Sequence, residues 1–268
     1  MRDDAAPIKL IQILSDGKAY SQKQLTKKMN IGYLELEKYI QTLKDWKIHI
    51  FKIKNQDYQL KSSMQLLNKE KINKELPGRR VFILPVVDST NQYLLDRVNI
   101  LKSGDVCTAE YQQLGRGRRG NQWFSPFGSN LYLSMYWLLQ IDYEVNVMNL
   151  SIFISNIIFN TLQEQGILGI KIKWPNDIYL NNRKLAGILV EIKGHNRNRL
   201  EIVIGVGINL AMKKLANNAW IQKNWIDLQE AGVNIDRNYL LVFTINAMRK
   251  ALIQFENNKS SILLKHLR

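Results

Sequence analysis

The sequence predicts an α+β protein with two domains, and three observations support this. Its 268 residues suffice for two domains at roughly 150 residues each, with enough chain to bury a core. Up to about residue 60 the apolar residues follow a helical period, whereas strands and helices are mixed from residue 64 onward. Three late strands follow one another at short intervals, which suits antiparallel pairing in a mixed sheet. We expect a first domain over residues 1–63 and a second over 64–268.

The first domain has the pattern of three helices and a hairpin. Pro7 is suited to the start of a helix, and Ser21 and Gln24 form an S-x-x-Q capping box that begins a second helix. A third helix has its apolar face at i, i+4 and i+7: Leu36, Ile40 and Leu43. Alternating residues on both sides of a polar Asn-Gln-Asp turn then predict a β-hairpin. This order is typical of a winged helix-turn-helix, whose third helix enters a major groove. The alternative is a helical bundle that contacts proteins.

The second domain combines apolar strands with helices. A helix capped by Ser89 or Thr90 follows the first strand. A long, largely buried helix runs from about Met148 to Gln165 and ends at Gly166. Strands are predicted for the segments VFILPVV, LYLSMYWLL, KIKWPNDIYL, KLAGILVEI and RLEIVIGVGINL.

Composition limits the class of protein. A single cysteine, Cys107, excludes an intramolecular disulfide and a cysteine-cluster zinc site, and three scattered histidines disfavour a histidine metal centre. No apolar run is long enough to span a membrane and the N-terminus has no secretory core, so we expect a cytoplasmic protein without a membrane partner. The 38 basic and 23 acidic residues give a net charge of +15. That charge suits a polyanionic partner, and coding bias explains it equally well.

A loop rich in glycine and arginine is the first candidate for binding chemistry. Gly115-Arg-Gly-Arg-Arg-Gly120 matches the dinucleotide pattern G-x-G-x-x-G, but Pro126 and Gly128 prevent the helix that this pattern needs. Glycines let backbone amides approach an anion, and arginines orient phosphate or carboxylate oxygens. Gln112 and Trp123 flank this flexible loop, so we favour an anion-binding loop over a plain solvated basic one.

Two further clusters carry polar groups at strand ends. Lys173-Trp-Pro-Asn-Asp177 points a carboxamide and a carboxylate from a strand corner, and Asp177 could hold Mg²⁺ on a nucleotide. Lys184 begins an apolar strand, where its charge needs an anionic partner. Gly205-Val-Gly-Ile-Asn209 allows a ligand to approach the backbone, although a glycine bulge explains it as well. Together with the arginine loop, the first cluster and Lys184 describe a site for two anions.

These motifs occur in the order and spacing of the biotin protein ligase family, which the sequence resembles from about residue 7 to 255. The motifs that carry the resemblance are Asp88-Ser-Thr-Asn91, Gly115-Arg-Gly-Arg-Arg-Gly120 with Trp123, Lys173-Trp-Pro-Asn-Asp177, Lys184-Leu-Ala-Gly187 and Gly205-x-Gly-Ile-Asn209. The N-terminal module makes the chain most similar to the bifunctional bacterial type, which ligates biotin and represses biotin-synthesis genes. For the second domain the resemblance implies the mixed-sheet, class II synthetase-like catalytic fold of that family.

The resemblance implies an ATP-dependent ligase. Enzymes of this family activate biotin with MgATP to biotinyl-5′-AMP and pyrophosphate. They then transfer biotin to one lysine of the biotin carboxyl carrier protein of acetyl-CoA carboxylase. The implied substrates and cofactors are ATP, Mg²⁺ and biotin, and the implied partner is that carrier protein. A homodimer and operator DNA are further partners that the resemblance allows.

Carried onto this sequence, the resemblance implies a role for each motif residue. Lys184 and Arg118 are implied to be catalytic. The implied biotin-binding set is Ser89, Thr90, Asn91, Gln112, Arg116, Gly117, Arg118 and Lys184. The implied ATP-binding set is Arg119, Trp123, Asn176, Asp177 and Asn209, with Asp177 at the Mg²⁺ ion.

The chain departs from the bifunctional type in two places. It stops at Arg268, where that type continues into an SH3-like barrel, so we expect this C-terminal domain to be missing. In the third helix Glu35 and Glu37 would oppose DNA phosphates, and the wing turn Asn55-Gln-Asp57 lacks glycine. We therefore expect weak, salt-dependent DNA binding with little preference for a biotin operator.

Two alternative functions stay open beside the ligase. One is a biotinyl-AMP-dependent transcriptional repressor with little ligase turnover. The other is a lipoate ligase, which shares the catalytic fold but is disfavoured by the Arg-Gly-Arg-Arg-Gly and Trp-Pro-Asn-Asp motifs.

Overall fold

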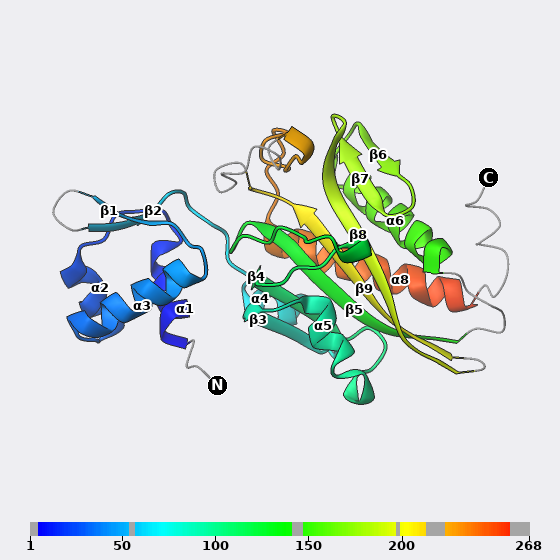
Figure 1. The fold of residues 1–268 in the computed structure, drawn as a ribbon, viewed down its shortest axis with the longest axis horizontal. Helices are drawn as coiled ribbons and strands as arrows, with labels where there is room; N and C mark the ends of the chain where they lie inside the picture. Colours follow the sequence, from blue (N-terminus) through cyan, green and yellow to red (C-terminus); the bar gives the residue numbers. More distant parts are fainter. Residues whose placement is uncertain (1–4, 54–56, 141–146, 197–198, 213–222, 258–268) are drawn as a thin grey trace.

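The computed structural model describes residues 5–53, 57–140, 147–196, 199–212 and 223–257. Figure 1 shows a small N-terminal part made of helices and a hairpin, joined by one extended segment to a larger part in which helices cover a twisted sheet. Within the described segments, no helix is long and apolar enough to cross a membrane.

The N-terminal part contains the predicted elements in the predicted order. They are α1 (Ala5–Leu14), α2 (Gln22–Met29), α3 (Tyr33–Asp45), β1 (Ile50–Ile53) and β2 (Asp57–Leu60). The two strands pair antiparallel, while the wing turn at 54–56 lies outside the described residues. Ser21 and Gln24 make both hydrogen bonds of the capping box, which confirms the predicted start of α2. The apolar face predicted for α3 is buried.

The core of this small part extends into the larger one. Trp46, which caps α3, stacks on Phe127 with ring centroids 5.8 Å apart and an interplanar angle of 3°. Met64 and Tyr111, both beyond residue 63, pack against the same apolar cluster. The two parts therefore share buried surface across the predicted boundary.

The larger part is built on a seven-stranded sheet with the strand order β3-β4-β5-β9-β8-β7-β6. Its strands are β3 (Val81–Val87), β4 (Val106–Gln112), β5 (Asn130–Gln140), β6 (Ile170–Lys173), β7 (Asp177–Leu180), β8 (Arg183–Asn196) and β9 (Arg199–Asn209). Only the pair β3 and β4 is parallel among the described ladders, and the others are antiparallel. The predicted mixed sheet is confirmed.

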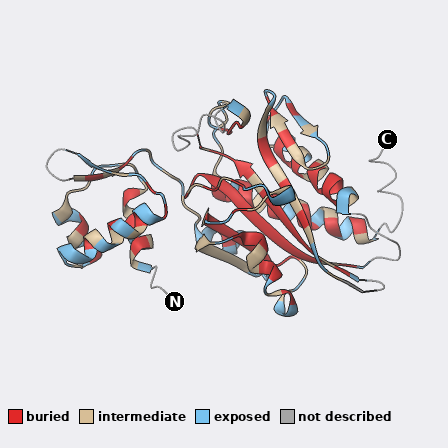
Figure 2. Cartoon of the chain, in the orientation of Figure 1, coloured by how far each residue is buried: buried red, intermediate tan, exposed pale blue. Residues whose placement is uncertain are grey.

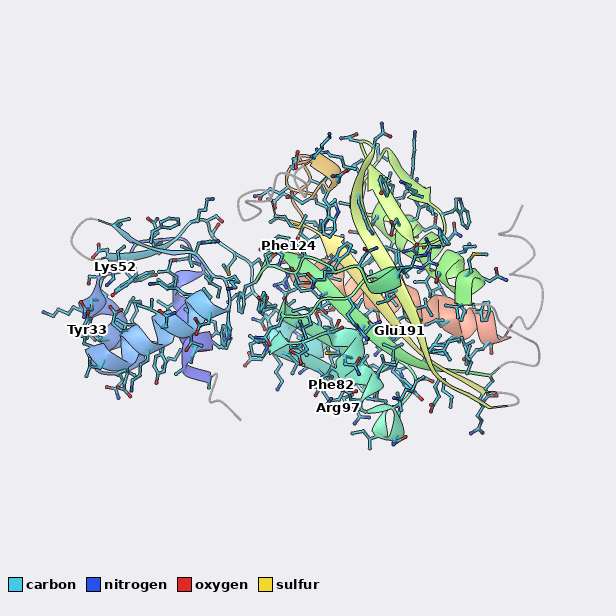
Figure 3. The ribbon with its side chains drawn as sticks, in the orientation of Figure 1. Tyr33, Lys52, Phe82, Arg97, Phe124 and Glu191 are labelled. Carbon is cyan, nitrogen blue, oxygen red and sulfur yellow. The ribbon has the colours of Figure 1, made fainter. Side chains whose placement is uncertain are left out.

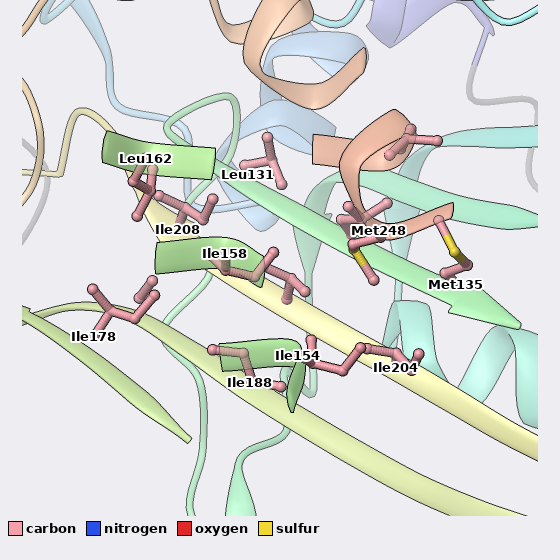
Figure 4. Close-up of a cluster of buried hydrophobic side chains, with 14 of the residues drawn as sticks. Leu131, Met135, Ile154, Ile158, Leu162, Ile178, Ile188, Ile204, Ile208 and Met248 are labelled. Carbon is pink, nitrogen blue, oxygen red and sulfur yellow. The ribbon is translucent and has the colours of Figure 1, made fainter. Parts of the chain in front are cut away.

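Helices cover both faces of this sheet. Four of them are α4 (Lys69–Glu75), α5 (Thr90–Leu95), α6 (Val147–Glu164) and α8 (Arg237–Asn257). On β5, Met135 belongs to the main core beneath α6 and α8, whereas its neighbour Tyr136 packs on the α5 side. This alternation follows from the two-residue period of a strand. Figure 4 shows side chains of α6 and α8 meeting those of β5 and β9, and Figure 2 shows the central strands buried.

One strand prediction was wrong, and some elements, β4 and α4 among them, were not predicted. The segment KIKWPNDIYL is not one strand but the hairpin of β6 and β7, in which Lys173 pairs with Asp177. Pro175 has no backbone N–H to give to a ladder, so the chain turns there instead of continuing extended. Strand β4 and the short helix α4 carry no strong local signal in the sequence.

Cys107 lies fully buried on β4, on the α5 side of the sheet. Burial raises the pKa of its thiol well above the ordinary value, because the apolar surroundings disfavour the thiolate. We expect the folded protein to show no thiol reactive toward an aromatic disulfide reagent at pH 8, and one thiol per chain after denaturation in urea. Stoichiometric labelling of the native protein would show that this strand is not packed as described.

Candidate functional site

The predicted motifs meet at one small cavity above the carboxyl end of β4 and the middle of β8 and β9. All but three of the predicted site residues line it: Ser89, Thr90, Asn91, Gln112, Arg116, Gly117, Arg118, Trp123, Asn176 and Lys184. Arg119, Asp177 and Asn209 do not. Segments separated by a hundred residues therefore contribute to one site, which the sequence indicated only through its motifs.

A buried hydrogen-bond cluster forms the floor of the cavity. Ser89 caps α5, and the next two residues, Thr90 and Asn91, are buried in its first turn. The Oε1 atom of Gln112 accepts hydrogen bonds from the Thr90 amide at 2.9 Å and from its hydroxyl at 3.1 Å. The Nε2 atom of Gln112 donates to Ser125 at 2.9 Å. These polar groups are fixed by one another, so the cavity presents a set arrangement of donors and acceptors.

The glycine and arginine loop is held in a defined conformation. The Gly117 amide donates to the Asn121 carbonyl at 2.7 Å, and the Trp123 amide donates to the Gly115 carbonyl at 2.8 Å. The flexible loop expected from the sequence thus folds back on itself. Arg119 has a left-handed φ of 55° and lies exposed on the outer side, away from the cavity.

Two arginines of this loop reach across to the sheet. Arg116 forms an ion pair with Glu191 on β8, with 2.7 Å between Nη2 and Oε2. Arg118 donates from Nη1 to Oδ1 of Asn176 at 2.7 Å. Both guanidinium groups are therefore close to the cavity and partly shielded from water, where their attraction for an anion is stronger than in solvent.

Lys184 lies at the rim of the cavity and is paired with Asp177. Their Nζ and Oδ1 atoms are 2.8 Å apart, with side chains 20% and 22% exposed. The Asn176 side-chain amide donates to the same oxygen at 3.0 Å. The β7–β8 ladder, with a register shift beside Tyr179, brings Lys184 and Asp177 together. An anionic ligand of Lys184 would replace the Asp177 carboxylate.

The described residues fit a Mg²⁺ ion that arrives with a nucleotide. They contain no group of three or more His, Cys, Asp or Glu side chains placed to hold a metal. Mg²⁺ commonly keeps its waters and binds one or two carboxylates together with substrate phosphates. Asp177 can provide one such carboxylate once Lys184 has moved to a ligand.

Trp123 lies flat against two glycines and forms one wall of the cavity. A Cβ atom on Gly207 would be 2.5 Å from Cε2 of the indole, and one on Gly187 would be 2.8 Å from Cζ3. The indole also packs on Trp225, with centroids 4.8 Å apart, and Lys184 Nζ lies 5.3 Å from its ring centre. These glycines are needed for close approach, as the sequence suggested for Gly205 to Asn209.

Asn209, which the resemblance places in the ATP-binding set, lies outside the lining of this cavity. Its side chain is fully buried, and Nδ2 donates to the carbonyls of Lys184 and Ile226, each at 3.2 Å. It therefore fastens the segment at Ile226 beside the strand that carries Lys184.

Sequence reasoning missed two polar residues of the site. Ser134 on β5 is fully buried and contacts Thr90 and Asn91. Glu191 on β8 contacts Asn91 and Arg116. Each is a lone polar residue within an apolar strand, and that interruption is the signal that could have identified it.

Comparison with known proteins identifies the family. The sequence model of the biotin/lipoate A/B protein ligase family matches residues 83–209. The chain is 48% identical over 256 residues to the bifunctional ligase/repressor BirA of Escherichia coli, covering 96% of this chain and 79% of that protein. The chain belongs to the biotin protein ligase family. The BirA of Salmonella typhimurium is 47% identical with the same coverage.

Solved structures show the same fold. The biotin protein ligase of Aquifex aeolicus, in complex with biotin and ATP, superposes with a TM-score of 0.57 at 27% identity. The match covers 67% of this chain and 73% of that one. The expected biotin ligase fold of the second domain is thereby confirmed.

Proposed function

We propose that this chain is an ATP-dependent biotin–[biotin carboxyl carrier protein] ligase. It would convert biotin and ATP to biotinyl-5′-AMP and transfer biotin to a lysine of the acetyl-CoA carboxylase carrier protein. The observation that carries the proposal is the convergence of Lys184, Arg116 and Arg118 on one cavity with a polar floor. Joining a carboxylate to a phosphate brings two anions together, and fixed cations stabilise the charge that develops.

In the first step, the formation of biotinyl-5′-AMP, each residue of the site would have a separate role. A carboxylate oxygen of biotin forms a bond to the α-phosphorus, and the bond from that phosphorus to the pyrophosphate oxygen breaks. Lys184, having left Asp177, would neutralise the carboxylate and the α-phosphoryl oxygens. Asp177 would then face the Mg²⁺ that accompanies ATP, and Trp123 would form the wall beside the adenylate. No proton transfer is required, because the attacking carboxylate is already ionised and pyrophosphate leaves as an anion.

In the second step, the transfer of biotin, the acceptor lysine supplies the nucleophile. The enzyme must therefore protect the intermediate and needs no nucleophilic side chain of its own. The amine of the acceptor lysine attacks the acyl carbon, AMP leaves, and the amine loses a proton. Until then water must be kept from the mixed anhydride. The hydrogen-bonded arginine loop, tied to β8 through Arg116 and to Asn176 through Arg118, would provide this cover.

A biotinylation assay tests the proposal. The full chain is incubated with biotin, ATP and a purified carrier domain, with Mg²⁺ or with a chelator. Labelled carrier and one pyrophosphate per biotin are expected only with Mg²⁺, and excess lipoate should not compete. Tight binding of biotinyl-AMP without labelled carrier would instead identify a repressor with little turnover. Because the reaction consumes ATP, we expect the protein to act in the cytoplasm.

We also propose that the N-terminal part is a winged helix-turn-helix that binds DNA. The order of three helices and a hairpin supports this, as does similarity to relatives named ligase/repressor. Glu35 and Glu37, near the start of α3, are already engaged within the domain. Glu35 accepts from the Gly32 amide at 2.9 Å, and Glu37 binds Tyr58 and, at 3.2 Å, Lys52 of β1. The exposed first turn of α3 presents Tyr33 and Leu34, neither of which is a strong reader of base edges.

We expect weak and strongly salt-dependent DNA binding. Residues 1–63 contain 12 basic and seven acidic residues, so attraction to phosphates is retained, while base-reading groups at the start of α3 are few. The measurement is fluorescence anisotropy of protein saturated with biotinyl-AMP, titrated onto operator and scrambled duplexes at about 150 mM salt. Specific sites usually exceed non-specific ones by about 10³ or more, and a preference of that size would overturn the expectation.

A further inference from the structure

Glu191 contacts two separate parts of the candidate site. It lies on β8, where Figure 3 labels it, and its side chain is 26% exposed. A single oxygen, Oε2, accepts from Nη2 of Arg116 at 2.7 Å and from Nδ2 of Asn91 at 2.8 Å. The same atom therefore holds the arginine loop and the floor of the cavity.

The chemistry of a carboxylate fixes the direction of the hydrogen bonds beyond it. An ionised carboxylate only accepts, so Asn91 must turn its amide nitrogen toward Glu191 and its oxygen toward Ser134. Ser134 lies 2.5 Å from that oxygen, and its hydroxyl has one hydrogen to give. The Ser134 oxygen is then free to accept from the Thr90 hydroxyl, 2.7 Å away.

This order of donors reaches the substrate cavity. The Thr90 hydroxyl has one hydrogen, for which the Ser134 oxygen and Oε1 of Gln112, 3.1 Å away, are the two acceptors. Because the Ser134 hydrogen is given to Asn91 and not to Thr90, the lone pairs of the Thr90 oxygen are left for a ligand. Thr90 lines the cavity, and an oxygen acceptor at this position suits an N–H donor such as that of a cyclic urea. The direction of the hydrogen bonds from Glu191 through Asn91 and Ser134 would thus determine whether the N–H or the C=O end of a urea group faces Thr90.

We propose that Glu191 is a positioning residue for the ligation reaction, which holds the arginine loop closed through Arg116 and makes Thr90 an acceptor for the biotin urea through Asn91 and Ser134. This inference rests on the proposed function, because it concerns the same cavity. Two separable effects follow. Loss of the contact between Glu191 and Arg116 should release the adenylate, and loss of the contact between Glu191 and Asn91 should weaken biotin binding.

The test is Glu191→Gln in the full chain. Glutamine keeps the size, but it loses the charge and can present an N–H to Asn91. Losing one charge-assisted hydrogen bond typically changes an equilibrium by about ten- to a hundredfold. We expect the KM for biotin in pyrophosphate release and the dissociation rate of biotinyl-AMP each to rise by about tenfold or more. The kcat for pyrophosphate release should stay within about threefold, because Lys184 is untouched.

Two further variants distinguish the effects of the two Glu191 contacts. Ser134→Ala should raise the KM for biotin without speeding adenylate release. Arg116→Met should speed adenylate release, and adding Glu191→Gln to it should not speed release further by more than about threefold, because the two residues act through one contact. Glu201→Gln is the matched control, since this carboxylate on β9 bonds Tyr136 at 3.3 Å instead of a site residue.

The outcomes distinguish this inference from the proposed function. Biotin affinity is also measured by calorimetry without ATP, so a chain that binds biotin but releases no pyrophosphate refutes the ligase while still testing Glu191. If Glu191→Gln folds with the parental unfolding midpoint and changes neither biotin affinity nor adenylate release by more than twofold, the positioning role is refuted. If that variant is unstable, Arg116→Met and Ser134→Ala provide the test. The positioning role is refuted if each of these two variants changes both biotin affinity and adenylate release, because the two contacts of Glu191 would then not have separate effects.

Discussion

Replacing Lys184 with alanine is expected to lower the rate of pyrophosphate release by about 10²–10³-fold, the usual effect of removing a group that stabilises developing charge. In the structure this ammonium group lies at the cavity rim and forms an ion pair with Asp177 at 2.8 Å. Without Lys184 the Asp177 carboxylate would also face the two substrate anions unpaired. The measurement is a coupled assay of pyrophosphate under saturating biotin and MgATP.

The matched control for this variant is Lys171→Ala, which removes an exposed lysine of β6, two strands away from β8 in the sheet. It lowers the net charge equally and should leave the rate unchanged. Thermal unfolding of both variants shows whether the fold is intact. A Lys184→Ala protein that releases pyrophosphate within about threefold of the parental rate would remove this residue from the catalytic step.

Arg237→Met is expected to lower the free energy of unfolding by about 3–5 kcal/mol, as is typical when one partner of a buried ion pair is removed. The Arg237 and Glu110 side chains are 3% and 8% exposed, and they are bonded to each other. Arg237 also donates to the carbonyls of Asn130 at 2.8 Å and Gln65 at 3.0 Å. Its loss would leave Glu110 charged in the core and would release the segment that joins the two parts.

Urea unfolding followed by tryptophan fluorescence measures this change. Lys71→Ala is the control, because Lys71 and Asp236 are 51% and 38% exposed, and such surface pairs contribute about 1 kcal/mol at most. Adding Glu110→Gln to Arg237→Met should recover part of the loss, since the buried charge is then gone. An Arg237→Met protein as stable as the control would mean that water reaches this pair.

Local sequence patterns were sufficient for much of the fold. The capping box at Ser21 and the helical period of α3 act within one or two turns, so the sequence predicted both helices correctly. The glycines at 205 and 207 were noted because they allow close approach of a ligand to the backbone. In the structure Trp123 approaches Gly207 and Asn91 approaches Gly205, and no local pattern could have named either neighbour.

Contacts between distant segments could not be predicted in this way. The Glu110 and Arg237 pair joins residues 127 positions apart, and the Arg116 and Glu191 pair joins residues 75 apart. Their partners are set by the strand order, in which β9 lies between β5 and β8 although it follows both in sequence. For the same reason the hydrogen bonds of Asn209 to the carbonyls of Lys184 and Ile226 could not be predicted from its motif.

If Lys184 binds the biotin carboxylate and Asp177 the Mg²⁺ of ATP, as proposed, their ion pair would link the two small substrates thermodynamically. Biotin alone would have to separate the two charges, and the free energy of that separation would weaken its binding. MgATP would supply a cation that can bind Asp177 in place of Lys184. When both substrates are present, the free energy of separating the ion pair is therefore spent once and not twice. Each substrate should therefore increase the affinity for the other by the same factor, as reciprocal linkage requires. Because Asp177 serves as the counterion of Lys184 before substrates bind, the site would favour the complex with both reactants over a complex with only one of them.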